Sequence, residues 1–224
     1  MSAMVTIDIW SDVMCPWCVI GYKNLERALA TFEGEIEAEI RWLPFELNPD
    51  MPPEGEESRA HIARKYGRTP EQASAGAAMM AERARVAGFP FDYTGPGEAP
   101  PAMLWNTFDA HKLLRWALQS AGAEAQTRLK LALFAAHFQQ RRNMADREVL
   151  LNVAQASGFD RQQAKAGLDD SGIAQEVRAE EQRAFDHSVS GVPAMVIDGQ
   201  FLVPGAQEPE TYVNVLRKVV ARSG

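Results

Sequence analysis

Short apolar blocks with strand-like spacing lie near both ends of the chain, and apolar residues at helical spacing fill the long middle. Residues 5–10 and 36–45 have the patterns typical of β-strands, and residues 18–31 between them form a predicted helix. The proline-rich residues 48–53 end this pattern, because clusters of proline and asparagine favour loops. The chain therefore begins with a predicted β-α-β unit.

The middle of the chain, from about residue 56 to 189, is predicted to be almost wholly helical. One helix has clear boundary signals: Thr69 is a favoured N-cap, Pro70 suits the first helical position, and Gly88 suits the end. Residues 89–101, rich in glycine and proline, form a predicted loop. Four further helices are expected at residues 106–121, 124–141, 147–157 and 172–187.

Strand-like sequence returns near the end of the chain. Residues 194–203 contain two short apolar blocks joined by an Asp-Gly pair, which predicts a β-hairpin, and residues 208–222 form a predicted amphipathic helix. A strand pattern that is interrupted by helices and then resumes indicates one domain inserted into another. We predict a discontinuous domain of residues 1–55 and 189–224 and an inserted helical domain of residues 56–188.

The composition limits the possible classes of function. Of the 224 residues, 46% are apolar and 24% are charged, as in ordinary globular proteins, and the formal net charge is -7. This acidic balance argues against nucleic-acid partners, because phosphate recognition favours a basic surface. No apolar run approaches the length of a membrane span, and the first residues lack the basic and apolar regions of a signal peptide. We therefore expect a cytoplasmic protein with no membrane partner.

The chain has two cysteines, and both lie in the sequence Cys15-Pro16-Trp17-Cys18, between the first predicted strand and helix. A thiol at a helix N-terminus meets unpaired backbone N–H groups and the positive end of the helix dipole, which favour a thiolate. Two such thiols can alternate between a dithiol and a disulfide, so redox catalysis is the first hypothesis. The alternative is half of a zinc site. We expect no metal, because zinc needs two more ligands and the histidines lack paired spacing: His61, His111, His137 and His187.

Further motifs accompany the cysteine pair along nearly the whole chain. They are Ser11-Asp12-Val13-Met14 before the cysteines, Pro44-Phe45-Glu46-Leu47-Asn48-Pro49, Asn106-Thr107-Phe108-Asp109-Ala110-His111, Ser190-Gly191-Val192-Pro193 and Pro204-Gly205-Ala206-Gln207. With these motifs the chain resembles the DsbA family of thiol–disulfide oxidoreductases, and within it the cytoplasmic FrnE-like subfamily. The resemblance implies an α/β protein with a large all-helical domain inserted into a thioredoxin fold. The related 2-hydroxychromene-2-carboxylate isomerases and kappa-class glutathione transferases have a serine where this chain has Cys15, which disfavours their chemistry here.

The resemblance also implies roles for the site residues. Cys15, at the start of the helix and expected to be the more exposed thiol, is the attacking thiolate, and Cys18, one turn later, resolves the mixed disulfide. Pro193 is expected to be a cis proline that faces Cys15, and Val192 to offer its backbone to an extended substrate. The competing interpretation of Pro193 is an ordinary trans proline that ends a loop.

Two acidic residues precede the cysteines. Asp8 resembles the position at which thioredoxin-fold proteins keep a buried acid beneath the cysteines, where it would accept the proton of Cys18. It is equally compatible with a solvent-facing position in the first strand. Asp12 is the rival acid and is expected to face solvent in the loop.

Pro16, Trp17, Val192 and Met14 are the candidate substrate-binding residues. Methionine and aromatic side chains more often belong to the core, and of these side chains Trp17 is the one favoured as part of an apolar rim. We expect an enzyme that exchanges electrons with disulfides of proteins or small molecules. No tightly bound cofactor is expected, and glutathione is a candidate redox partner. The alternatives are a glutathione-dependent transferase or isomerase, and a non-enzymatic chaperone that binds clients through an apolar rim.

Overall fold

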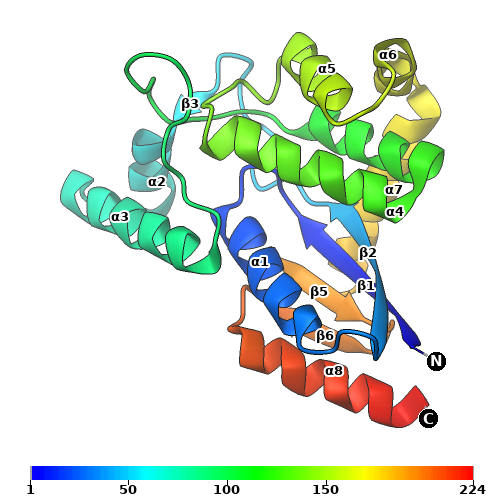
Figure 1. Ribbon diagram of the computed structural model, residues 1–224. Coiled ribbons are helices and arrows are strands. Elements are labelled where there is room, and N and C mark those ends of the chain that lie inside the picture. The colour runs from blue at the N-terminus through cyan, green and yellow to red at the C-terminus, as the bar shows by residue number, and fades with distance from the viewer. Residues whose placement is uncertain (1, 224) are drawn as a thin grey trace.

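A four-stranded mixed sheet lies at the centre of the computed structural model, which describes residues 2–223 (Figure 1). Its strands are β1 (Ala3–Ser11), β2 (Ile36–Pro44), β5 (Ala194–Ile197) and β6 (Phe201–Pro204). The spatial order is β2-β1-β5-β6: β1 is parallel to β2 and antiparallel to β5, and β5 is antiparallel to β6. Together with helices α1 (Pro16–Ala30) and α8 (Pro209–Ser223), these strands form what we call the sheet region.

The chain between β2 and β5 forms the helical insert. Its helices are α2 (Ser58–Tyr66), α3 (Pro70–Ala87), α4 (Phe108–Phe138), α5 (Arg147–Ala156), α6 (Arg161–Asp169) and α7 (Ser171–Asp186). Two short strands, β3 (Glu56–Glu57) and β4 (Met103–Leu104), pair antiparallel within it. The expectation that the insert is all-helical is therefore wrong in this detail. A strand of two residues is too short for alternation to reveal it in the sequence.

The helix-boundary signals of α3 are present in the structure. The Thr69 hydroxyl accepts a hydrogen bond from the Gln72 backbone N–H, and the Gln72 side chain accepts one from the Thr69 backbone, which is a capping box. Gly88 ends the helix with a φ of 88°, a left-handed conformation that glycine adopts without a steric penalty. The cap and the terminal glycine thus define α3 from local sequence alone.

Helix α4 is kinked at Gly122, where φ is 83° and ψ is 179°. This kink separates the two helices that the sequence predicts at residues 106–121 and 124–141. Although α4 is 31 residues long, none of the helices within residues 2–223 is long and apolar enough to cross a membrane.

Helix α6 is missed by the sequence analysis because it packs through small side chains. Its buried residues are Ala164, Gly167 and Leu168. A Cβ atom at Gly167 would lie 2.4 Å from the indole ring of Trp116, so a glycine is needed for this close approach. A helix with so few large apolar residues gives a weak periodic signal.

The two faces of the sheet pack against different helices (Figure 1). Val5, Ile7 and Ile9 of β1 are fully buried in a core shared with α1 and α8. The next residue, Trp10, belongs to a second cluster, together with Leu43 of β2 and residues near the end of α7. Because successive side chains of a strand point to opposite faces, this alternation decides which residues of β1 can lie under α1.

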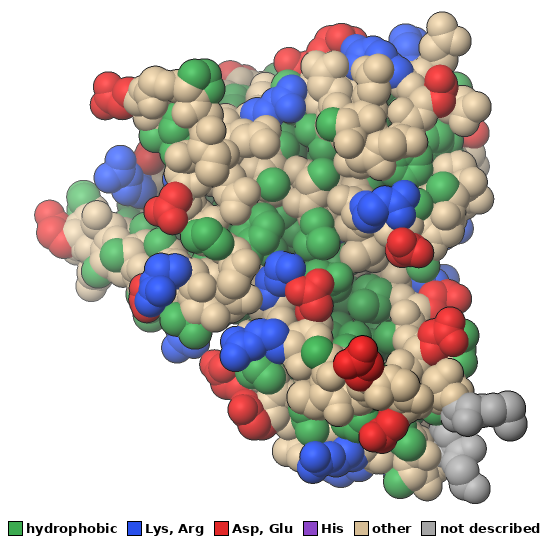
Figure 2. Space-filling view, viewed as in Figure 1, with side chains coloured by type: hydrophobic (Ala, Val, Ile, Leu, Met, Phe, Trp, Pro, Cys, Tyr) green, Lys and Arg blue, Asp and Glu red, His purple; other side chains and the backbone are tan. Residues whose placement is uncertain are grey.

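The helical insert packs tightly against the sheet region. The side-chain amide of Gln126 in α4 accepts a hydrogen bond from the Trp42 N–H and donates one to the Trp42 carbonyl, both at 2.8 Å, along the outer edge of β2. Val13, in the loop between β1 and α1, is buried among apolar residues of α4 and α5. Figure 2 shows hydrophobic side chains gathered along the seam where α4 meets α1. The insert therefore contacts the segment that leads to the cysteines.

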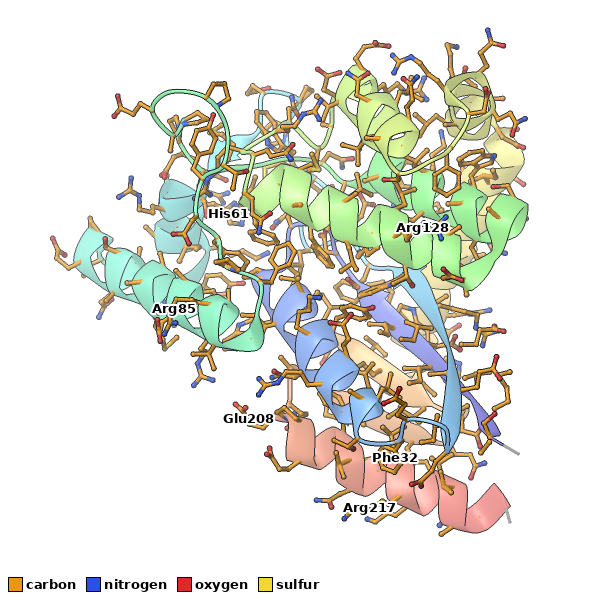
Figure 3. The ribbon with its side chains drawn as sticks, in the orientation of Figure 1. Phe32, His61, Arg85, Arg128, Glu208 and Arg217 are labelled. Carbon is orange, nitrogen blue, oxygen red and sulfur yellow. The ribbon has the colours of Figure 1, made fainter. Side chains whose placement is uncertain are left out.

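Helices α2 and α3 form a hairpin that lies beside α1, marked by His61 and Arg85 in Figure 3. It contacts α1 through Ala84 and Ala87, which pack against Ile20. These small side chains let α3 approach the first turns of α1 closely.

Gly21 provides a test of the packing around α1. A Cβ atom there would lie 3.2 Å from the Pro193 ring and 3.3 Å from the Ala206 Cα atom. The variant Gly21→Val should therefore overpack this contact and lower the free energy of unfolding by roughly 1–3 kcal/mol. Gly76→Val in α3 is the matched control, because nothing lies within 4 Å of its Cβ position, and it should change stability by less than about 0.5 kcal/mol. Urea unfolding of both variants measures the difference, and equal stabilities would contradict the packing.

Candidate active site

The β1–α1 loop places the two cysteines at the start of α1. Cys15 is the N-cap residue, with the extended backbone (φ -84°, ψ 111°) that this position requires, and its N–H donates to the Asp12 carbonyl at 3.1 Å. Pro16 occupies the first turn, where a missing N–H costs nothing. Cys18 follows within the same turn, and its N–H donates to the Cys15 carbonyl. Both thiols are free and face the same core cluster.

A loop distant in sequence closes over Cys15. The Cys15 thiol donates a hydrogen bond to the Val192 carbonyl at 3.5 Å, across 177 positions of the chain. The Val192–Pro193 peptide bond is cis, and Pro193 is buried directly before β5. Cys15 is 3% exposed and Cys18 is 0% exposed, so the expected difference in exposure between the two thiols is small.

The two thiols differ in their electrostatic surroundings. Interaction with the neighbouring Cys18, together with burial, raises the pKa of the Cys15 thiol well above its usual range. Burial also acts to raise the pKa of the Cys18 thiol. Its hydrogen bond with Cys15 and the positive charge of Lys130 outweigh burial, so the pKa of Cys18 is lowered. These surroundings favour the thiolate form of Cys18 over that of Cys15, whereas the sequence analysis expects the thiolate at Cys15.

Asp12, expected in solvent, is fully buried beneath the cysteine loop. Its carboxylate accepts hydrogen bonds from the backbone N–H groups of Met14, at 3.2 Å, and Leu47, at 2.8 Å. Burial raises the pKa of Asp12, although these hydrogen bonds and Lys130 act to lower it. The buried His111 lies 4.0 Å from this carboxylate, and burial lowers its pKa well below the usual range. The acid beside the cysteines is therefore Asp12.

Asp8, the first candidate for that role, lies on the wrong face of the sheet. It alternates with Ile7 and Ile9, which pack under α1, and so points toward the face covered by α7. Its carboxylate forms a bidentate ion pair with Arg41, at 2.6 and 2.9 Å, and its side chain is 24% exposed. The proposed catalytic role of Asp8 is wrong, and the alternation of β1 contains the signal that would have excluded it.

Lys130 is a residue of the site that the sequence analysis missed. It is 0% exposed, lies in α4, and is close enough to Cys18, Asp12 and Cys15 for their charges to raise its pKa. Burial opposes them and lowers the pKa of Lys130 to about 8. One sequence signal could have found it: Lys130 stands one helical turn from Phe134 on the apolar stripe of its helix.

The candidate substrate-binding residues do not all lie at the surface. Pro16, Trp17 and Val192 are partly buried beside Cys15, and the guanidinium of Arg83 in α3 lies 5.5 Å from the centre of the Trp17 ring. Met14, by contrast, is buried in the insert core, and its sulfur accepts a hydrogen bond from the Trp105 N–H. A substrate-binding role for Met14 is therefore wrong, because its side chain holds the cysteine loop against the insert.

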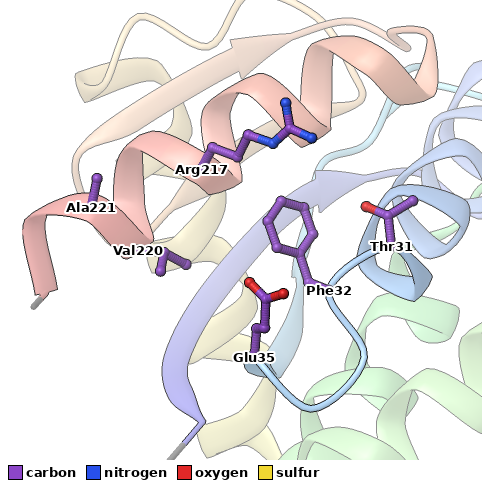
Figure 4. Close-up of a pocket in the computed structure, with 6 residues that line it drawn as sticks. All are labelled: Thr31, Phe32, Glu35, Arg217, Val220 and Ala221. Carbon is purple, nitrogen blue, oxygen red and sulfur yellow. The ribbon is translucent and has the colours of Figure 1, made fainter.

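A pocket elsewhere in the molecule is remote from this chemistry. It is lined by Thr31, Phe32, Glu35, Arg217, Val220 and Ala221, between the end of α1 and the last turns of α8 (Figure 4). The cysteines lie at the opposite end of α1. Within residues 2–223, no three His, Cys, Asp or Glu side chains are grouped so that they could hold a metal ion.

The two aspartates can be compared by mutation. Asp12→Ala leaves two backbone N–H groups without their buried acceptor and should lower the free energy of unfolding by roughly 2–4 kcal/mol. Asp8→Ala removes a partly exposed ion pair and should cost no more than about 1 kcal/mol. Urea unfolding checks both values. A larger loss for Asp8→Ala than for Asp12→Ala would contradict the assignment of Asp12 as the structural and electrostatic partner of the cysteine loop.

Comparison with known proteins identifies the family. Residues 6–217 match the DSBA-like thioredoxin domain. The structure is similar to that of a probable DsbA oxidoreductase from Streptomyces coelicolor, with 32% identity, coverage of 96% of this chain and 89% of the other, and a TM-score of 0.83. Over 209 residues the sequence is 25% identical to YwbO of Bacillus subtilis, covering 93% and 94% of the two chains.

A more distant likeness concerns the fold alone. The cytosolic disulfide reductase DsbM from Pseudomonas aeruginosa, also solved with GSH, shares 17% identity, with coverage of 96% and 98% and a TM-score of 0.63. The sheet region and the helical insert together are thus a thioredoxin fold interrupted by helices, and the chain belongs to the DSBA-like thioredoxin domain family.

Proposed function

We propose that this protein is a thiol–disulfide oxidoreductase that exchanges electrons with disulfides of proteins or small molecules through Cys15 and Cys18. The observation that carries the proposal is the pair of free thiols at the start of α1, one of them hydrogen-bonded to the carbonyl that precedes a cis proline. Membership of the DSBA-like family supports it.

Cys15 is proposed to be the attacking thiol, because it stands at the helix N-terminus and meets the loop of Val192. As it attacks, its proton passes to the neighbouring Cys18 thiolate, so that Cys18 acts as the base. The Cys15 sulfur then forms a bond to one sulfur of the substrate disulfide, and the other substrate sulfur leaves as a thiolate. The product is a mixed disulfide at Cys15.

Cys18 is proposed to complete the reaction. Cys18 gives the proton it took from Cys15 to the substrate thiolate that left first, and its own thiolate then attacks the Cys15 sulfur. A disulfide forms between the two cysteines, and the remaining substrate half leaves as a thiolate. Two electrons pass from the protein to the substrate, and the same steps in reverse oxidise a dithiol substrate. The surroundings that lower the pKa of Cys18 favour this step, because the resolving sulfur must be a thiolate.

The substrate is proposed to lie along the loop that contains Val192 and Pro193, with Pro16 and Trp17 forming an apolar rim. Pro193 has no N–H, so it makes no hydrogen bond that would compete with an approaching chain. An extended substrate backbone could then pair with Val192. The aromatic ring of Trp17, with Arg83 beside it, offers contact area for apolar or anionic groups near the sulfur.

Glutathione is a proposed redox partner of the dithiol, with no cofactor held permanently. The fold likeness to a reductase that has been solved with GSH supports this choice. We also propose a cytoplasmic location, with a thioredoxin-like domain of residues 1–55 and 189–224 and an inserted domain of residues 56–188. The presence of only two cysteines, both in the active pair, suits a reducing compartment.

Cys18→Ser should trap a mixed disulfide at Cys15 after incubation with oxidised glutathione, because the resolving thiol is gone. Cys15→Ser, the matched variant, should form almost no adduct, because Cys18 lies inside the first turn of α1, whereas Cys15 meets the Val192 loop along which the substrate is proposed to lie. Intact-protein mass spectrometry, with circular dichroism to show that both variants are folded, measures the adducts.

Equal adduct formation at the two positions would contradict the assignment of the nucleophile. Undiminished catalytic turnover by Cys18→Ser would instead favour a glutathione-dependent transferase or isomerase, because conjugation requires no resolving thiol.

A further inference from the structure

A buried lysine beside the cysteine pair has an ammonium group without a hydrogen-bond acceptor. Lys130 is 0% exposed, and among residues 2–223 no hydrogen-bond partner of its Nζ atom is found. A buried ammonium group is costly unless an opposite charge lies near it. The surroundings of Lys130 must therefore supply negative charge.

Two aromatic rings hold the Lys130 side chain in place. Its Nζ atom lies 4.9 Å from the centre of the Phe134 ring and 5.2 Å from that of the Trp42 ring. The attraction between a cation and these rings favours the ammonium form but does not neutralise its charge. Trp42 and Phe134 belong to the same core cluster as the two cysteines, and the charges of Cys18 and Cys15 act on the Lys130 ammonium group held between these rings.

The negatively charged groups that act on Lys130 lie at the start of α1 and in the loop before it. The groups are Cys18, Asp12 and Cys15, whose charges all favour the ammonium form. His111, in the first half of α4, adds no negative charge, and burial and the charge of Lys130 lower its pKa well below the usual range. When Cys18 is part of a disulfide, its negative charge is lost while Asp12 remains. The charge balance around Lys130 therefore depends on the redox state.

We propose that Lys130 is a positioning residue for the dithiol, whose ammonium group stabilises the Cys18 thiolate and so favours the reduced state of the Cys15–Cys18 pair. The inference rests on the proposed function, because it concerns the reduction potential of that couple. In the oxidation step, the Cys15 thiol and the Cys18 thiolate form a disulfide. The substrate disulfide accepts two electrons and the Cys15 proton, and leaves as one thiol and one thiolate.

Lys130→Met tests this role, because methionine keeps an unbranched apolar side chain between the two rings and removes the charge. The equilibrium constant for oxidation of the dithiol by oxidised glutathione should rise about tenfold or more, which corresponds to a reduction potential about 30 mV more negative. The ultraviolet absorbance of the thiolate should appear at higher pH in the reduced variant than in the reduced wild type.

Lys112→Met is the matched control, since Lys112 is also buried in α4. Its ammonium group donates to the Leu168 carbonyl and pairs with Asp109, away from the cysteines. This variant should lose stability and keep the wild-type equilibrium with glutathione. Urea unfolding of the reduced and oxidised forms separates the two roles of Lys130: a purely structural role changes both stabilities equally, whereas the proposed role changes their difference.

Lys130→Gln, which is also uncharged, should behave like Lys130→Met and serves in its place if that variant does not fold. A folded uncharged variant with an equilibrium constant within about twofold of wild type and an unchanged thiolate titration would overturn the inference. A wild-type protein that does not equilibrate with glutathione would instead contradict the proposed function. The thiolate titration of the reduced protein would then still decide the role of Lys130.

Discussion

Two backbone N–H groups, one just before the cysteines and one just after β2, donate to the same buried carboxylate of Asp12. The backbone carbonyl of Asp12 also accepts the N–H of Cys15. One residue thus fixes the path of the β1–α1 loop and ties that loop to the neighbouring strand end. The position of Cys15 at the start of α1 depends on this path, because a loop of different shape would begin the helix at another residue.

The buried carboxylate of Asp12 in turn depends on neighbouring groups that compensate its charge. An isolated carboxylate inside a protein is costly, and here backbone donors and the ammonium group of Lys130 compensate it. These compensating groups come from the β1–α1 loop, from the loop after β2 and from helix α4 of the insert. The insert is therefore part of the environment in which the cysteines ionise, in addition to being a cover over them.

The parts of this structure that depend on neighbours in sequence were predictable. The cap at Thr69, the terminal Gly88 and the placement of the cysteines between a strand and a helix all follow from local rules. The burial of Asp12 was not predictable in this way, because its partner Leu47 lies 35 positions away. Lys130 was missed for a related reason: a lysine is ordinarily taken as surface, and its counter-charges come from distant segments.

The strand order has a consequence for the growing chain on the ribosome. Strand β1 meets its parallel neighbour β2 early in synthesis, but its other neighbour, β5, begins only at Ala194. Until then one edge of β1 carries unpaired N–H and C=O groups next to an apolar face, which favours wrong pairing with other chains. The insert helices, which emerge in the meantime, can already cover the opposite edge at Trp42 through Gln126. During synthesis the unpaired backbone groups are thus confined to the edge of β1 that β5 will later cover. Nascent chains that stop before residue 194 are therefore the species most prone to aggregation.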